Sequence, residues 1–239
     1  MTESLRFHHY YVLASKGIQE YILRGDKLKL MIGGSELIDK LSSNLVERLL
    51  HAMGLSPESD FTILMKAAGG VRILFAEKEY AERFAALLPP AISRYAPGLD
   101  FVQTVREVGG SLAEAMDEAE KALAVRRNLV HPSYPVPGPL VERSPRSGLP
   151  SCGILKFSGG SREEADESMI AKHGASESAK SELARRTLPD GKIIHGVPQL
   201  PLPDDLADLA DGENSTIAIV HIDANGLGQI VTSLFEELK

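Results

Sequence analysis

Two short apolar runs separated by only four residues constrain the fold of this chain more than any other feature. Residues 61–66 and 71–76 have the length and composition of β-strands, and Ala67-Ala68-Gly69-Gly70 lies between them. A connection of this length that contains glycine is typical of a β-hairpin. The sequence therefore predicts two neighbouring antiparallel strands in the first half of the chain.

The segment before this hairpin predicts a strand followed by two helices. Residues 6–14 are rich in aromatic and β-branched side chains, which favour a strand. Residues 17–31 have apolar side chains at helical spacing, and Gly33-Gly34 predicts a break after them. Ser35 is placed to cap a second helix. The apolar stripe of that helix is formed by Leu37, Ile38, Leu41, Leu45 and Leu49.

The segment after the hairpin predicts a helix, a strand and a second, charged helix. Residues 79–88 have helical character, and Pro89-Pro90 is expected to interrupt this helix before residues 92–95. Residues 100–108 alternate between apolar and polar side chains, as a strand does. Ser111 is then expected to cap a helix that ends near Asn128.

The order of these elements predicts the fold class. Strand, helix, hairpin, helix and strand form a βαββαβ series, which is the ferredoxin-like arrangement of an antiparallel sheet with helices on one face. We therefore expect an α+β fold. Nucleic-acid polymerase palms and nucleotidyl cyclases use this arrangement, but many unrelated small domains use it too, so the fold alone does not give the function.

The distribution of proline indicates how the rest of the chain is organised. Residues 132–150 hold six of the 14 prolines and predict a loop or linker, and a helix is expected around 163–186. A compact apolar strand over 215–222 and a helix over 227–238 follow, and they cannot bury their own faces. We expect three parts: a first palm-like domain over 1–130, a Pro-rich linker with a small helical region over 131–213, and the first strand and helix of a truncated second palm over 214–239.

Composition and charge exclude several classes of protein. Hydrophobic residues make up 43% of the chain and charged residues 25%, which suits a globular protein with a sizeable core. No apolar run approaches the ~20 residues of a membrane helix, and the N-terminus lacks the order of a signal peptide. One cysteine, Cys152, excludes an internal disulfide framework, so we expect a cytoplasmic, reduced protein. The formal net charge of -7 argues against a chain that coats nucleic acid by bulk electrostatics.

The segment 217–228 carries the strongest chemical signal. An apolar strand delivers Asp223 at its end, and a turn that contains Gly226 and Gly228 leads into the next helix. In palm enzymes an aspartate in this position holds Mg²⁺, and backbone N–H groups at the helix N-terminus face the triphosphate. The alternative interpretation is that Asp223 only caps the following helix.

Three matches, carried by four segments, resemble one known family, and they occur in that family's order. The run 221–229, His-Ile-Asp-Ala-Asn-Gly-Leu-Gly-Gln, is similar to the first motif of the active palm in the large subunit of type III CRISPR RNA-guided complexes. The segments 14–22 and 33–38 resemble that family's first domain, where a Gly-Ile-Gln helix leads into a Gly-Ser element. Residues 67–75 resemble its glycine-bearing hairpin.

This resemblance implies an activity, a set of partners and a set of site residues. The family's second palm converts ATP into cyclic oligoadenylate when target RNA is bound, in antiviral defence, and its first palm helps to hold nucleotide. By position, Asp223 would be the catalytic metal ligand for Mg²⁺ or Mn²⁺, with the carbonyl of Ile222 as a second contact. Gly34 and Ser35 would face a nucleotide, although Ser35 could equally be a plain N-cap. The phosphates would contact the amides of Ala224, Asn225, Gly226 and Leu227. The partners would be other subunits of the ribonucleoprotein and, mostly indirectly, guide and target RNA.

The chain departs from the family pattern at three places. Ala67-Ala68-Gly69-Gly70 has no acidic pair, and Ala14-Ser15 stands where a metal-binding palm would have aspartate. We therefore expect no metal in the first palm. The Gly-Gly-Asp-Asp hairpin of the active palm does not occur in the chain, so we expect the chain alone to be inactive. The segment 142–153 looks like a relic of a zinc knuckle in which Cys152 is the one cysteine left, which makes a structural zinc doubtful.

Two other functions stay open at this point. The chain could belong to a catalytically inactive scaffold subunit of an RNA-guided complex, or to a stand-alone palm nucleotidyl cyclase. An acidic pair in the second hairpin would favour catalysis over scaffolding. Copurification with RNA and repeated backbone subunits would separate a CRISPR subunit from a stand-alone cyclase.

Overall fold

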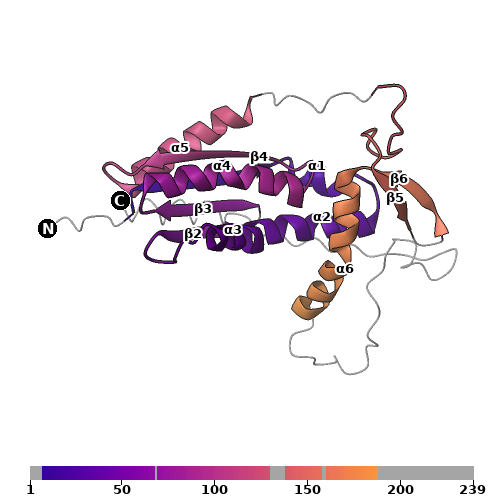
Figure 1. The fold of residues 1–239 in the computed structure, drawn as a ribbon, viewed down its shortest axis with the longest axis horizontal. Helices are drawn as coiled ribbons and strands as arrows, with labels where there is room; N and C mark the ends of the chain where they lie inside the picture. The colour runs from indigo at the N-terminus through magenta and orange to yellow at the C-terminus, as the bar shows by residue number, and fades with distance from the viewer. Residues whose placement is uncertain (1–6, 68, 130–137, 158–159, 188–239) are drawn as a thin grey trace, which may run out of the picture. The chain divides into compact units, whose positions relative to one another are not determined.

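The computed structural model describes residues 7–67, 69–129, 138–157 and 160–187 of the chain (Figure 1). The chain divides into two units, Met1–Asp205 and Leu206–Lys239. All of the described residues belong to the first unit, so the fold below is that of the first unit. The predicted second palm lies outside the described residues, and the three predicted parts of the chain stay a prediction.

A four-stranded antiparallel sheet forms the centre of the described region. Its strands are β1 (His9–Lys16), β2 (Phe61–Ala67), β3 (Gly70–Phe75) and β4 (Asp100–Glu107), in the spatial order β2-β3-β1-β4. This order places the first and third strands at the centre, as the ferredoxin-like fold requires. The prediction of an α+β, ferredoxin-like fold and that of the hairpin are thus confirmed.

Both faces of the sheet are buried, because consecutive residues of β1 enter different cores. Tyr11 and Leu13 belong to the larger core, and Tyr10 and Val12 belong to the smaller one. Side chains alternate between the two faces of a strand. The continuous apolar run in β1 therefore reflects a sheet with packed side chains on both sides.

Helices from three segments cover the face that carries Tyr11. They are the short α1 (Ile18–Leu23), the continuous stretch of α2 (Leu28–Lys40), the π-helix η1 (Leu41–Leu45) and α3 (Val46–Ala52), and finally α4 (Lys78–Tyr95). Phe84 of α4 meets the Tyr11 ring edge-on at 5.0 Å between ring centroids. Such edge-to-face pairs add to the stability that burial of apolar area supplies.

A separate helix, α5 (Leu112–Arg127), covers the opposite face of the sheet. Ala115, Ala119 and Leu123 recur every four residues and are buried against that face. The Ser111 hydroxyl accepts a hydrogen bond from the Glu114 amide at 3.1 Å. This side-chain cap confirms the predicted start of the helix.

The predicted break at Gly33-Gly34 is wrong, because α2 runs through both glycines. The chain breaks instead at Gly25 and Asp26, whose φ angles are 113° and 51°. The glycines serve a helix crossing: a Cβ on Gly33 would lie 1.8 Å from the carbonyl oxygen of Lys172 in α6 (Glu167–Thr187). Glycine is required there because two helix backbones approach closely.

The predicted interruption at Pro89-Pro90 is also wrong, because α4 continues through both prolines. Proline at position 89 cannot donate the helical hydrogen bond to the carbonyl of Ala85. Gln103 of β4 replaces that donor, since its Nε2 donates to the Ala85 oxygen at 2.8 Å. The Tyr11 hydroxyl in turn donates to Gln103 Oε1 at 2.7 Å. Both polar atoms of the Gln103 side chain are therefore hydrogen-bonded.

A small hairpin and a long helix follow the linker. The predicted helix around 163–186 begins only at Glu167, because the preceding residues form β6 (Arg162–Ala165), which pairs with β5 (Gly153–Lys156). Leu155 and Ala165 of this hairpin pack on Met169 of α6 and on Leu30 of α2. Figure 1 shows α6 crossing α2, and these helices are in contact. None of the helices in the described part of the chain combines the length and apolar composition of a membrane crossing.

Candidate functional site

Most of the predicted site residues lie outside the described part of the chain. They are the predicted metal contacts Asp223 and Ile222 and the predicted phosphate contacts Ala224, Asn225, Gly226 and Leu227. Their roles stay predictions. Gly34 and Ser35 are described, and both lie in the middle of α2.

Gly34 is buried, whereas the Ser35 side chain next to it is exposed. A Cβ on Gly34 would lie 3.4 Å both from the Ile22 Cα and from the Lys172 Cε. The position is therefore used to pack α1 and α6 against α2. Ser35 is not the N-cap that the glycine pair suggested, since it lies within a continuous helix. Contact of either residue with a nucleotide stays a prediction.

Lys172, which sequence reasoning missed, lies in α6, and its side chain reaches the C-terminal end of α1. Its side chain is fully buried, and its Nζ donates to the carbonyl of Tyr21 and, at 3.1 Å, to that of Arg24. The Nζ also lies 4.2 Å from the centroid of the Tyr21 ring. Burial lowers the pKa of Lys172 to about 8, and the Arg24 guanidinium lowers it as well, while Asp166 opposes the shift. The last carbonyls of a helix lack helical donors, and a cation there is favourable.

The end of β1 and the β2–β3 connection form the place where an active palm would hold its metal. The Ser15 amide and hydroxyl both donate to the carbonyl of Gly69, at 3.0 and 2.8 Å. Gly69 has a φ of 72°, and a Cβ on it would lie 2.7 Å from the Ser15 oxygen. These groups are a hydroxyl and a backbone carbonyl, and they do not fit the carboxylate set that Mg²⁺ prefers. Across the described ranges, no three His, Cys, Asp or Glu side chains could together hold a metal ion.

Hydrogen bonds to carboxylates hold the segment that resembles a zinc knuckle. Arg146 donates to Glu163 through two nitrogens, at 2.6 and 2.8 Å, and this hydrogen bonding lowers the pKa of Glu163. The Ser147 hydroxyl donates to Asp166, and the Ser151 hydroxyl donates to the Glu164 carboxylate. Because of these bonds the 143–152 loop is fixed against β6 and the start of α6.

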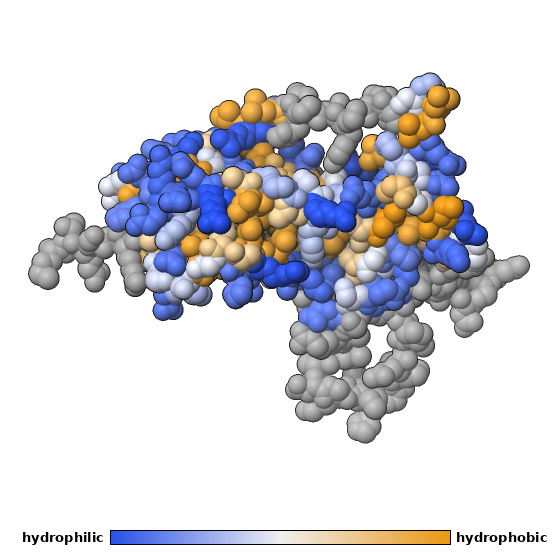
Figure 2. All heavy atoms as spheres, in the orientation of Figure 1, coloured by the Kyte–Doolittle hydropathy of each residue, from blue (hydrophilic) through white to orange (hydrophobic). Residues whose placement is uncertain are grey.

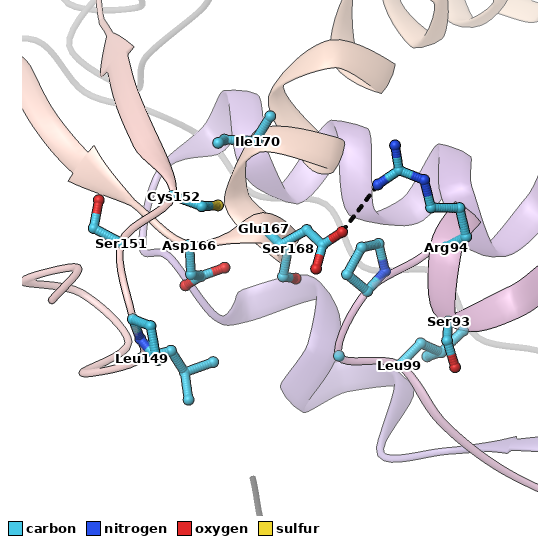
Figure 3. A pocket seen from close by; sticks show the side chains of 13 residues that line it. Ser93, Arg94, Leu99, Leu149, Ser151, Cys152, Asp166, Glu167, Ser168 and Ile170 are labelled. Carbon is cyan, nitrogen blue, oxygen red and sulfur yellow. Dashed lines mark hydrogen bonds and ion pairs between the residues drawn. The ribbon is translucent and has the colours of Figure 1, made fainter. Parts of the chain in front are cut away.

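A pocket of about 690 Å³ lies between this loop, the C-terminal end of α4 and the start of α6 (Figure 3). The carboxylates of Asp166 and Glu167 lie beside the apolar side chains that line it, and Glu167 pairs with Arg94 of α4 at 3.1 Å. The Cys152 thiol also lines the pocket. Burial raises the pKa of this thiol, and the negative charges of Glu167 and Asp166 raise it further. Sequence reasoning missed the pocket, because its residues come from three separate segments.

Comparison with known proteins gave matches among solved structures. No family model matches the chain. No curated protein matches it either. The apo Csm1–Csm4 cassette matches 52% of this chain at 19% identity with a TM-score of 0.41. The same cassette with one ATP matches 51% at 19% identity with a TM-score of 0.42, and Csm1 of T. onnurineus matches 51% at 19% identity with a TM-score of 0.41.

The matched part is small in relation to those proteins. In each of the three structures it covers 19% of the Csm1 chain. Identity at this level says nothing about activity. Another matching structure is described as the Csm1–Csm4 subcomplex of the type III-A CRISPR-Csm interference complex. The four structures named here are thus described as Csm1 alone or Csm1 together with Csm4.

Proposed function

We propose that this chain is the N-terminal part of a type III CRISPR large subunit, which in its intact form makes cyclic oligoadenylate from ATP when target RNA is bound. The observation that carries the proposal is the segment 217–228, in which an apolar run ends at Asp223 before a glycine-bearing turn. Three further segments, 14–22, 33–38 and 67–75, resemble the same family in the same order. Together these segments span most of the chain.

The described fold supports a division of labour between two palms. Its sheet has the strand order of a ferredoxin-like domain, and the end of β1 carries Ser15 bound to Gly69 in place of carboxylates. A palm without carboxylates at this position is suited to hold nucleotide rather than to bind a metal. We therefore assign the chemistry to the second palm, at Asp223.

The proposed contacts differ in kind between the two palms. The Asp223 carboxylate and the Ile222 carbonyl would hold Mg²⁺ or Mn²⁺, which supplies positive charge to the triphosphate of ATP. Ser35 would contact nucleotide from the first palm, since its side chain is exposed. Gly34 would contribute by allowing α6 to pack closely, because the position is already in contact with Lys172.

The proposed partners are those of a ribonucleoprotein. Csm1 structures have been solved with Csm4, with one ATP and with cA3. We propose that this chain likewise acts with a further CRISPR subunit and with guide and target RNA. The net charge of -7 suits a chain that leaves most phosphate contacts to those subunits.

The test uses the natural full-length protein, assembled with its guide RNA and partner subunits. ATP and Mn²⁺ are supplied with or without target RNA, and the products are identified by mass spectrometry. We expect target-dependent cyclic oligoadenylate, and we expect Asp223→Ala to reduce its rate by at least about 10²-fold. Asp100→Ala, at an exposed position of β4, is the matched control and should leave the rate unchanged.

Two outcomes would contradict the proposal. Undiminished synthesis by Asp223→Ala would remove this carboxylate from the mechanism. Absence of any oligoadenylate from the wild-type complex, with RNA bound, would instead favour the inactive scaffold.

A further inference from the structure

We propose that the pocket between α4, the 143–152 loop and the start of α6 binds a planar cation. This cation would be an amidinium or a guanidinium that is attached to an apolar group. A volume of about 690 Å³ lies within the range of sites that bind small molecules or a side chain with its neighbours. The pocket is distinct from the predicted nucleotide contacts at Gly34 and Ser35, which do not line it. The inference therefore goes beyond the proposed function.

The charge in the pocket favours a cation over a phosphate. Asp166 is 3% exposed, and its two oxygens accept from the Met169 amide, at 2.9 Å, and from the Ser147 hydroxyl. Each carboxylate oxygen can accept a further hydrogen bond. No ion pair of Asp166 occurs in the ranges that the structure describes. Asp166 and Glu167 both line the pocket, and their negative charges raise the pKa of the Cys152 thiol beside them.

The cations near the pocket are already engaged. Arg94, the one lining residue with a positive charge, pairs with Glu167 and is largely exposed. Arg24, which lies close to Gly98, pairs with Glu20 at 2.6 Å. Lys172 donates to backbone carbonyls, as described above. Each of these three cations therefore already has an acceptor within the protein.

A buried hydroxyl provides a second, independent observation. Ser168 lines the pocket and is 4% exposed, and its oxygen has no partner at hydrogen-bond geometry in the described part of the chain. Burial raises the pKa of the nearby Tyr21 hydroxyl and hydrogen bonding to Ser168 lowers it, although neither oxygen has a partner at full hydrogen-bond geometry within the described ranges. A buried polar group without a hydrogen bond is costly, on the order of 1–3 kcal/mol. A ligand N–H that reaches Ser168 would relieve this cost.

The pocket walls define the rest of the ligand. They are largely apolar and include Pro97, Leu99, Leu149, Pro150 and Ile170. Figure 2 shows apolar surface over the region of β5 and β6. Ile170 of α6, which lines the pocket, is 37% exposed. Apolar walls suit a flat hydrophobic group, while carboxylates suit the fork of N–H donors that a planar cation presents. An ammonium group matches this combination less well, because it is compact and strongly hydrated.

Benzamidine is a suitable probe, since it joins an apolar ring to an amidinium. Benzoate and benzamide have nearly the same shape, with a negative charge and no charge respectively. We expect saturable binding of benzamidine to the full 239-residue chain, measured by titration calorimetry, with an affinity at least about 10-fold higher than for either analogue. Equal affinity for benzoate would overturn the proposal.

Two variants locate the site. Asp166→Asn keeps an oxygen that can accept from the Met169 amide but removes the charge, and it should weaken benzamidine binding about 10-fold or more. Ser168→Ala removes a hydroxyl without a partner, so it should weaken binding several-fold and leave the thermal unfolding midpoint unchanged or higher. Asp100→Ala, on β4, is the control and should bind as the wild type does. Unchanged binding by a folded Asp166→Asn variant would contradict the proposal.

The natural source of the cation can be either an arginine of a partner protein or a free small molecule. If a partner arginine occupies the pocket, the isolated chain binds benzamidine and the assembled complex does not. If the ligand is a small molecule, both forms bind it. Neither measurement requires ATP or target RNA, so the result is independent of the proposed synthesis of oligoadenylate.

Discussion

The Lys172 ammonium is buried among backbone carbonyls and an aromatic ring, and no carboxylate lies at ion-pair distance from it within the described residues. Burial lowers its pKa to about 8, which is below the ordinary value of about 10.4. Between these values the unfolded chain binds more protons than the folded one. The free energy of unfolding should therefore rise with pH in this window.

This pH dependence gives the first prediction at the residue scale. From pH 7.5 to pH 10, the unfolding free energy of the wild type should rise relative to that of Lys172→Met, by on the order of 2 kcal/mol after solvent screening. The tyrosines Tyr10 and Tyr21 are common to both proteins, so their titration cancels in the difference. Urea unfolding of both proteins at several pH values measures this difference in the free energy of unfolding. Parallel pH profiles for the two proteins would show that the buried ammonium does not titrate in this window.

Gly33 gives a second prediction, with Gly174 as its matched control. Gly33→Ala places a Cβ 1.8 Å from the Lys172 carbonyl, and the two helices must move apart. We expect a loss of about 2 kcal/mol or more in the free energy of unfolding. Gly174→Ala, in α6, meets nothing within 4 Å and should stabilise the protein by about 0.5–1 kcal/mol. Equal effects of the two substitutions in urea denaturation would mean that the crossing of α2 and α6 is not close.

At the element scale, α4 depends on a residue of β4 for its continuity. Pro89 leaves the Ala85 carbonyl without a helical donor, and Gln103 supplies one from the sheet. Oε1 of the same side chain accepts a hydrogen bond from the Tyr11 hydroxyl of β1. Three elements of the fold therefore meet at the Gln103 amide, which explains how Pro89 is tolerated inside the helix.

This arrangement predicts an interaction between two positions. Gln103→Leu should destabilise the fold by about 2–3 kcal/mol, because it leaves the Ala85 carbonyl and the Tyr11 hydroxyl unpaired. Adding Pro89→Ala should recover part of the loss, since alanine at 89 can donate to Ala85 again. A double-mutant cycle from denaturant unfolding measures the coupling. Strict additivity of the two substitutions would rule out the shared carbonyl as its cause.

At the scale of the whole molecule, the proposed function separates nucleotide binding from metal chemistry. The first palm has Ser15 and Gly69 where carboxylates would be needed. One carboxylate, Asp223, cannot hold two metal ions. We therefore expect the 239-residue chain alone, with ATP and Mn²⁺, to form no cyclic oligoadenylate above background. Synthesis by the isolated chain, detected by mass spectrometry, would refute this division between the palms.

The sequence by itself determined the strand order along the chain, the hairpin at Gly69-Gly70 and the cap at Ser111, because each depends on neighbouring residues. Only the tertiary structure decided the roles of Gly33 and Pro89, since the groups that explain them, Lys172 and Gln103, are distant in the chain. The pocket beside Asp166 was likewise decided by the tertiary structure, because its lining residues come from three separate segments of the chain. A local pattern states what a residue prefers, but long-range packing decides which group it meets.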